Sequence, residues 1–305
     1  MNDMACEPSL WGGQWTEEKL DAFEKYVNAY LAIMNAFRDK YGWKLLYFDG
    51  FAGSGSRNDK KADEGTSLLQ DFFHESFIQE EELDLYKGAA ERVLSIPQRG
   101  FDYYYFVDND EESSSLLRQK LSPYMASHRL EFRISDANIE VEKLAAAMRK
   151  NLDLATLALL DPFGMQVRWD SIRQLKDTRT DLWLLIPTGV IVNRLLDRKG
   201  NLTHLERLIS FFGKDEDFLR SYFFQKRKEQ TLFGEIEIVE KVKQPIQKIA
   251  ELYIQQLQEI FKYVTPNPLV LYNTRHTPIF HFACASNNNT AIKIAKQIIN
   301  KIQVK

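Results

Sequence analysis

Residues 43–55 read WKLLYFDGFAGSG, and this stretch decides the fold. The short apolar run from Trp43 to Phe48 predicts a buried strand, and Asp49 closes it. The glycines that follow allow the backbone to turn sharply and to approach a ligand closely. The order of strand, acid and glycine-rich turn is typical of the first unit of a nucleotide-binding α/β sheet.

Two well-known phosphate-binding patterns do not fit this turn. A P-loop requires a lysine after its last glycine, and no lysine follows Gly55. A dinucleotide site requires a third glycine, but Arg57 and Asn58 stand where it would be. A turn that only joins a strand to a helix is the structural alternative.

Strand and helix patterns alternate on both sides of this stretch. A long amphipathic helix is expected from Thr16, as its N-cap, to Gly42. The span from Asp49 to Asp108 is long and must hold an extra element, for which residues 66–82 show a helical pattern. Alternation of this kind predicts βαβ units, and hence a Rossmann-like α/β fold with a mostly parallel sheet. The later strands are expected within 101–110, 129–138, 154–164 and 181–189, with helices at 111–121 and 141–151.

The pattern changes after Gly189, and we expect three parts. Residues 1–189 form the α/β core with its N-terminal helix, 190–262 a mainly helical insertion, and 263–305 a terminal antiparallel hairpin with a closing helix that completes the core. The insertion holds basic residues at 194–199, and Lys226, Arg227 and Lys228 stand beside the aromatic residues Tyr222, Phe223 and Phe224. Such residues can hold phosphates and stack bases, but a solvated helical face is the preferred interpretation.

Acids follow the next two predicted strands. Asp108, with Asp110 close by, ends the second, and Asp136 ends the third. Ligands of doubly wound sheets bind outside the carboxyl ends of the strands. The first carboxylate can accept hydrogen bonds from two ribose hydroxyls and the second from an exocyclic amine, so together they suit an adenosine group. Each acid alone is equally explained as a turn former.

The fourth strand ends in Asp161-Pro162-Phe163-Gly164. The carboxylate and the proline carbonyl can accept hydrogen bonds from a planar amine and orient its lone pair, while the ring of Phe163 can stack on a base. The structural alternative is a turn with a buried phenylalanine.

Composition excludes several classes of protein. The net charge of -3 gives no global attraction to nucleic acid, and Cys6 and Cys284 alone cannot form a disulfide framework or a zinc cluster. No metal site is therefore expected. The N-terminal residues show no signal-peptide pattern, and no apolar run is long enough to span a membrane, so a cytoplasmic protein is expected.

In this order, the motifs resemble those of class I S-adenosyl-L-methionine (SAM)-dependent methyltransferases. More narrowly, YFDGFAGSG, DPFGMQVRW, WTEEKL and HFACAS resemble the three-Cys-motif partner (TcmP) family, over about residues 15–302. That resemblance implies a separate three-Cys-motif protein as partner. It also implies SAM bound at Asp49, Gly50, Phe51, Ala52, Gly53 and Gly55, its ribose at Asp108 or Asp110, its adenine near Asp136, and the methyl acceptor at Asp161, Pro162 and Phe163.

The sequence leaves the acceptor and the activity open. Methyltransferases acting on adenine N6 usually have the aromatic residue fourth in this motif, whereas DPFG is more similar to the motif of tRNA guanine-N2 methyltransferases. An exocyclic amine of an RNA or DNA base is expected, but not which base. The alternative is a catalytically silent, methyltransferase-like binding partner of the three-Cys-motif protein. An NAD-dependent oxidoreductase is a weaker hypothesis, because the third glycine of a dinucleotide-binding motif is missing.

Overall fold

The computed structural model describes residues 13–55, 88–189, 202–231, 234–273 and 275–303. A central sheet of eight strands has the order β3-β2-β1-β4-β5-β10-β8, and β9 pairs with β10. Its strands are β1 (Lys44–Asp49), β2 (Tyr103–Asp108), β3 (Leu130–Ile134), β4 (Leu154–Leu160), β5 (Thr180–Ile186), β8 (Tyr263–Val264), β9 (Leu269–Tyr272) and β10 (Pro278–Ser286).

The first five strands run parallel to one another, and β10 is antiparallel to β5, β8 and β9. This confirms the predicted mostly parallel sheet and its terminal antiparallel hairpin, β9–β10. Since β1 lies between β2 and β4, the chain reverses direction across the sheet at β1, which is where doubly wound sheets bind ligands. The strand order is that of a Rossmann-like methyltransferase sheet.

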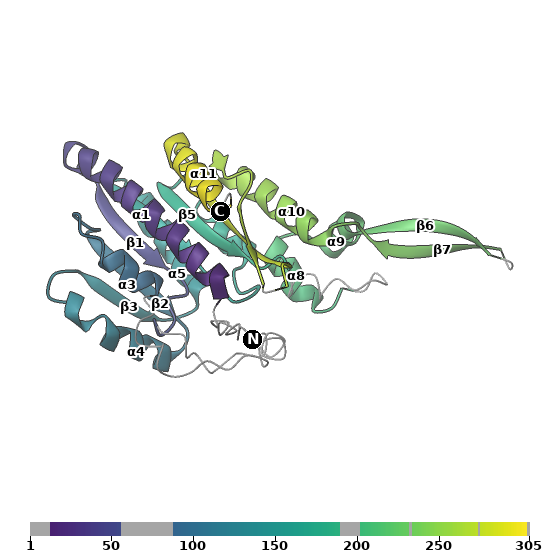
Figure 1. Ribbon diagram of the computed structural model, residues 1–305, viewed down its shortest axis with the longest axis horizontal. Coiled ribbons are helices and arrows are strands. Elements are labelled where there is room, and N and C mark those ends of the chain that lie inside the picture. Colours follow the sequence, from purple (N-terminus) through teal and green to yellow (C-terminus); the bar gives the residue numbers. More distant parts are fainter. Residues whose placement is uncertain (1–12, 56–87, 190–201, 232–233, 274, 304–305) are drawn as a thin grey trace, which may run out of the picture.

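Helices cover both faces of the sheet (Figure 1). One face packs against α1 (Gly13–Tyr41), α3 (Ala89–Leu94), α4 (Glu111–Lys120) and α11 (Asn289–Gln303). The other packs against α5 (Ala137–Lys150), α6 (Trp169–Arg173), α8 (Leu205–Phe212), α9 (Glu216–Phe223) and α10 (Pro245–Ile260). A short 3-10 turn, η2 (Ser122–Tyr124), follows α4. None of the described helices has the length and apolar character that crossing a bilayer requires.

The central strands are buried on both faces because helices cover both. Strand β4 is built from LATLALL, and all its residues except the first are buried. On α1, Phe23, Tyr26 and Tyr30 face the sheet, and Phe23 and Tyr26 both contact the ring of Trp183 on β5. The apolar face predicted for this helix is therefore confirmed. Its predicted N-cap is wrong, because α1 begins at Gly13 and Thr16 lies inside the first turns.

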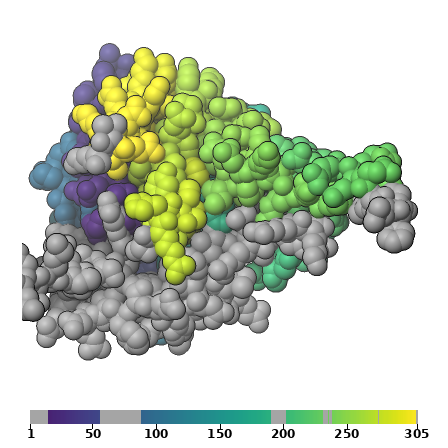
Figure 2. Space-filling model, turned by 45° about the vertical axis from the view of Figure 1, so that its right-hand side comes forward, coloured from purple at the N-terminus to yellow at the C-terminus, as the bar shows by residue number. Residues whose placement is uncertain are grey.

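The prediction of a mainly helical stretch at 190–262 needs a correction. The described part holds α8, α9 and α10, but between them the strands β6 (Phe224–Thr231) and β7 (Gly234–Lys241) form an antiparallel hairpin. Charged and apolar residues alternate over 235–238 in β7, and charges pair across the strands, as between Lys228 and Glu235 at 3.1 Å. The hairpin projects from the body of the molecule (Figures 1 and 2).

The correction extends to the basic cluster of the insertion. Lys226, Arg227 and Lys228 lie exposed on strand β6, so they form no helical face. Phe223 and Phe224 beside them are buried and cannot stack on bases. The helix predicted at 66–82 and the basic residues at 194–199 lie outside the described residues. The domain limits at 189 and 262 stay a prediction.

Candidate functional site

The glycine-rich turn after β1 is tied to both neighbouring strands. The amide of Gly50 donates to the carbonyl of Leu159 on β4 at 2.9 Å, and the amide of Ala52 donates to the carbonyl of Val107 on β2 at 2.9 Å. The turn, which includes Phe51, Gly53 and Gly55, therefore lies across the carboxyl ends of three adjacent strands. This is where the sequence predicted the cofactor residues.

Packing explains why glycines stand in this turn. A Cβ on Gly50 would lie 2.5 Å from Leu160 Cδ2, and a Cβ on Gly55 would lie 2.8 Å from Leu117 Cδ1. Gly53 and Gly55 also have positive φ angles of 60° and 71°, which favour glycine. Without side chains at these glycines a ligand can approach the turn closely, while the amides of residues 50–53 are bonded within the protein.

Asp49 ends β1 and is only 2% exposed. Its carboxylate accepts hydrogen bonds from the hydroxyl of Tyr47 at 3.0 Å and from the amide of Phe51 at 3.3 Å. Burial raises the pKa of Asp49 to about 7; the hydrogen bond from Tyr47 opposes this rise, and the nearby charges of Asp161 and Asp108 add to it. Asp49 therefore changes charge close to neutral pH.

Asp108 ends β2 and holds the glycine-rich turn. Its Oδ2 accepts from the amide of Gly53 at 2.8 Å, and its Oδ1 accepts from the amide of Asp110 at 2.8 Å. Asp110 instead caps helix α4, since its carboxylate accepts from the amide of Ser113 at 2.9 Å. Of the two acids that the sequence left open, Asp108 is thus the one that contacts the glycine-rich turn.

Asp136 lies one strand further out, after β3. Its Oδ1 accepts from the amides of Asn138 at 2.6 Å and Ile139 at 3.3 Å, so it is the N-cap of α5. Two apolar residues that sequence analysis missed flank it: Ile134 is 56% exposed and Ile139 is 44% exposed. Sequence alone contains no signal for them, because an isoleucine at a strand end is usually buried.

The segment Asp161-Pro162-Phe163 follows β4. Pro162 is buried, whereas the ring of Phe163 is 56% exposed and thus available for stacking. Buried Asn138 on α5 fixes the chain just beyond: its Nδ2 donates to the carbonyl of Gln166 at 2.9 Å, and its Oδ1 accepts from the amide of Arg168 at 2.7 Å. The alternative of a buried phenylalanine is therefore wrong for Phe163.

Lys19 is a site residue that sequence analysis missed. Its Nζ donates to Asp161 Oδ2 at 2.5 Å, its exposed fraction is only 6%, and it lies 5.5 Å from the ring centroid of Trp15. The ring of Trp15 in turn stacks on Phe280 of β10 at 5.3 Å. A signal was present in the sequence, because Trp15, Lys19 and Phe23 recur at intervals of four on the buried face of α1.

Asp49, Asp108 and Asp161 therefore meet at the carboxyl ends of β1, β2 and β4. The pKa of Asp49 responds to the charges of both other acids, and the ammonium of Lys19 is bonded to one of them, Asp161. Carboxylates gathered in a partly buried place favour a cationic ligand. The sulfonium and ammonium groups of SAM fit that requirement, and the glycines of the turn leave room for a ligand to approach it closely.

No family model matches this chain, and no curated protein matches it. Among solved structures, a Legionella pneumophila protein described as DUF519 has 11% identity and a TM-score of 0.41, covering 92% of this chain and 99% of its own. An rRNA methylase from Streptococcus thermophilus has 14% identity and a TM-score of 0.26, with 66% and 88% covered. A putative rRNA-methylase from Clostridium thermocellum has 11% identity and a TM-score of 0.24, with 69% and 97% covered.

At such low identities and TM-scores these likenesses carry no argument about what this chain does. The class of fold follows instead from the sheet itself: its strand order is that of a doubly wound, Rossmann-like α/β sheet, whose ligands bind at the carboxyl ends of the strands.

Proposed function

We propose that this chain is a SAM-dependent methyltransferase that acts on an exocyclic amine of an RNA or DNA base, together with a three-Cys-motif partner protein. The observation that supports it best is the convergence of Asp49, Asp108 and Asp161 beside the glycine-rich turn. The partner protein is proposed from the sequence resemblance alone.

The cofactor residues have distinct tasks in this proposal. The turn 50–55 packs against the cofactor, Asp108 accepts from the ribose hydroxyls, and Asp136 with Ile134 and Ile139 borders the adenine. Bound SAM supplies a methyl group on a cationic sulfur. Asp49, whose pKa lies at about 7, becomes anionic more easily beside that cation.

The acceptor residues lie on the next strand end. Asp161 accepts a hydrogen bond from the amine and orients its lone pair, the Pro162 carbonyl assists, and Phe163 stacks on the base. Lys19 holds Asp161 Oδ2, so Oδ1 is the atom that receives the amine. The amine attacks before it loses its proton, so catalysis rests mainly on positioning.

Calorimetric titration with SAM and with S-adenosylhomocysteine tests the cofactor assignment. We expect binding to the wild-type chain and its loss in Asp108→Ala and Asp49→Ala. Because Asp49 is buried, the isosteric variant Asp49→Asn is titrated beside Asp49→Ala. Asp110→Ala is the matched control for Asp108→Ala. Binding would justify a search for the acceptor with radiolabelled methyl groups over tRNA, rRNA and DNA. Absence of SAM binding, both alone and with the three-Cys-motif protein, would leave only the silent binding role.

A further inference from the structure

An aromatic ladder lies at the end of the molecule opposite the acidic site. It consists of Phe37 and Tyr41 on the last turns of α1, and Trp43 just before β1. The ring centroids of Phe37 and Tyr41 are 6.3 Å apart, and those of Tyr41 and Trp43 are 4.8 Å apart and stacked. Phe37 is 46% exposed and Tyr41 52% exposed, so these rings are open to a ligand.

Cations lie over two of the three rings of this ladder. Lys40 Nζ lies 5.2 Å from the ring centroid of Tyr41, and the guanidinium of Arg179 lies 4.9 Å from that of Trp43. Arg179 also donates to the carbonyl of Leu152 at 3.0 Å, which joins the ladder to the connection between α5 and β4. Stacked rings interleaved with cations are the pattern that binds bases and phosphates of single strands.

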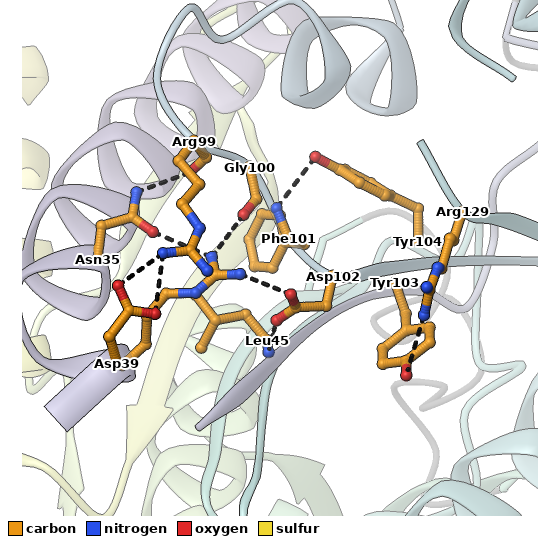
Figure 3. A network of polar contacts seen from close by, with 11 residues as sticks. Asn35, Asp39, Leu45, Arg99, Gly100, Phe101, Asp102, Tyr103, Tyr104 and Arg129 are labelled. Atoms are coloured by element: carbon orange, nitrogen blue, oxygen red, sulfur yellow. Dashed lines mark hydrogen bonds and ion pairs between the residues drawn. The ribbon is translucent and has the colours of Figure 1, made fainter. Parts of the chain in front are cut away.

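A cavity of about 480 Å³ lies on the other face of the sheet and reaches the amino end of β1 at Lys44, the residue after Trp43. Lys44 and the residues before β4 form one wall of the cavity. Tyr103 and Tyr105 also line the cavity, because both side chains point to the same face of β2. Arg129 lies 5.6 Å from the ring centroid of Tyr103, as Figure 3 illustrates, and Arg133 lies 5.7 Å from that of Tyr105. The combination of ring and guanidinium thus recurs in the cavity.

The charges of this surface favour an anionic ligand. Three of its carboxylates are paired with cations: Asp39 with Arg99 at 2.9 Å, Asp153 with Lys44 at 3.9 Å and Glu131 with Arg133 at 2.8 Å. The first of these pairs is visible in Figure 3. Lys40, Arg129 and Arg179 add three further positive charges over aromatic rings. The surface is therefore locally basic in a chain whose net charge is -3.

We propose that the ladder and the adjoining cavity form a binding surface for single-stranded nucleic acid, separate from the acidic site. Bases stack on Tyr41 and its neighbours, and the cations hold the phosphates. Strand β2 runs from Tyr103 at this surface to Asp108 at the acidic site, a distance of about 17 Å at the usual rise per residue. This proposal goes beyond the methyltransferase assignment and does not require it.

Fluorescence anisotropy of the full chain with labelled single-stranded oligouridylate and oligothymidylate tests the proposal, without SAM. Tyr41→Leu should weaken binding about 5- to 150-fold, the range that loss of one stacked base gives, whereas Tyr41→Phe should bind like wild type. Arg129→Gln should weaken binding and Arg129→Lys largely restore it. Added salt should weaken wild-type binding. Because Tyr41 and Arg129 lie on the surface, these variants are expected to fold.

Three outcomes would overturn the proposal: no oligonucleotide binding by the wild type, equal binding by Tyr41→Leu, or equal or tighter binding of a duplex. A loss of binding to the three-Cys-motif protein in Tyr41→Leu, with oligonucleotide binding unchanged, would assign the surface to that protein instead. SAM titration of the same variants keeps the two proposals apart, because either can fail while the other holds.

Discussion

Lys19 Nζ donates a hydrogen bond to Asp161 Oδ2 at 2.5 Å, although the two residues are 142 positions apart in the sequence. The contact joins the first turns of α1 to the carboxyl end of β4. Side-chain exposure is 8% for Lys19 and 20% for Asp161, so the pair is largely shielded from water. Helix α1 is thereby part of the site as well as a cover for the sheet.

Replacing Lys19 should destabilise the fold. Lys19→Met leaves the Asp161 carboxylate without its ammonium partner, and hydrogen bonds to charged groups contribute about 1.5–3 kcal/mol. Urea unfolding measures the difference in the free energy of unfolding. Lys25→Met is the matched control, because Lys25 lies exposed on the same helix. Equal stability of the two variants would mean that the ion pair contributes nothing.

Removing the carboxylate of Asp161 should separate catalysis from cofactor binding. If Asp161 orients the amine, Asp161→Asn should lower kcat by about 100-fold or more, since misplaced reactants lose rate on that scale. The affinity for SAM should stay nearly unchanged. Methyl transfer and calorimetric titration measure the two quantities, and a parallel loss of both would contradict the assigned role.

The ionisation of Asp49 should make stability depend on pH. Its folded pKa of about 7 exceeds the ordinary value of 3.8, so the folded chain holds this proton when the unfolded chain has released it. The contribution of Asp49 to stability is therefore complete below about pH 4 and falls as the pH rises toward 7, by at most about 1.4 kcal/mol per unit. Asp49→Asn should gain stability relative to wild type over this range.

Chemical unfolding of both chains at several pH values checks this expectation. A constant difference between them from pH 4 to 7 would show that Asp49 titrates outside this window.

The same proton should be linked to cofactor binding. A cationic ligand favours ionised Asp49, so the affinity for SAM should rise as the pH increases through about 7, with release of a proton. S-adenosylhomocysteine lacks the sulfonium charge and should show a smaller rise. Calorimetry in buffers of different ionisation enthalpy measures the protons released, and Asp49→Asn should release none from this position.

Gly55 and Gly42 offer a matched pair of substitutions. Both have positive φ angles, of 71° and 66°, but a Cβ on Gly55 would meet Leu117 at 2.8 Å, whereas a Cβ on Gly42 would meet nothing within 4 Å. Each alanine variant should lose about 1–2 kcal/mol for the left-handed backbone. Gly55→Ala should lose more and should also weaken SAM binding. If thermal unfolding shows equal losses of stability in the two variants, the contact with Leu117 does not oppose a Cβ at position 55.

The sequence alone determined the parallel sheet and the position of its acids. Continuous apolar runs such as 154–160 are typical of strands covered on both sides, and the residue after each run must then lie at a strand end. Because this reasoning is local, it places Asp49, Asp108 and Asp161 at one edge of the sheet without reference to any tertiary contact. The acid that follows β3, Asp136, is placed in the same way.

Only the tertiary structure decided which side chains contact these acids and which surfaces remain open. Lys19 reaches Asp161 because α1 crosses the sheet, and a helical pattern does not say over which strand a helix lies. The hairpin β6–β7 was not predicted, because its stability depends on cross-strand pairs, and the spacing of residues in the sequence does not say which residues pair. The exposure of Ile134, Phe163 and Tyr41 likewise depends on where neighbouring helices end, a property of packing rather than of local sequence.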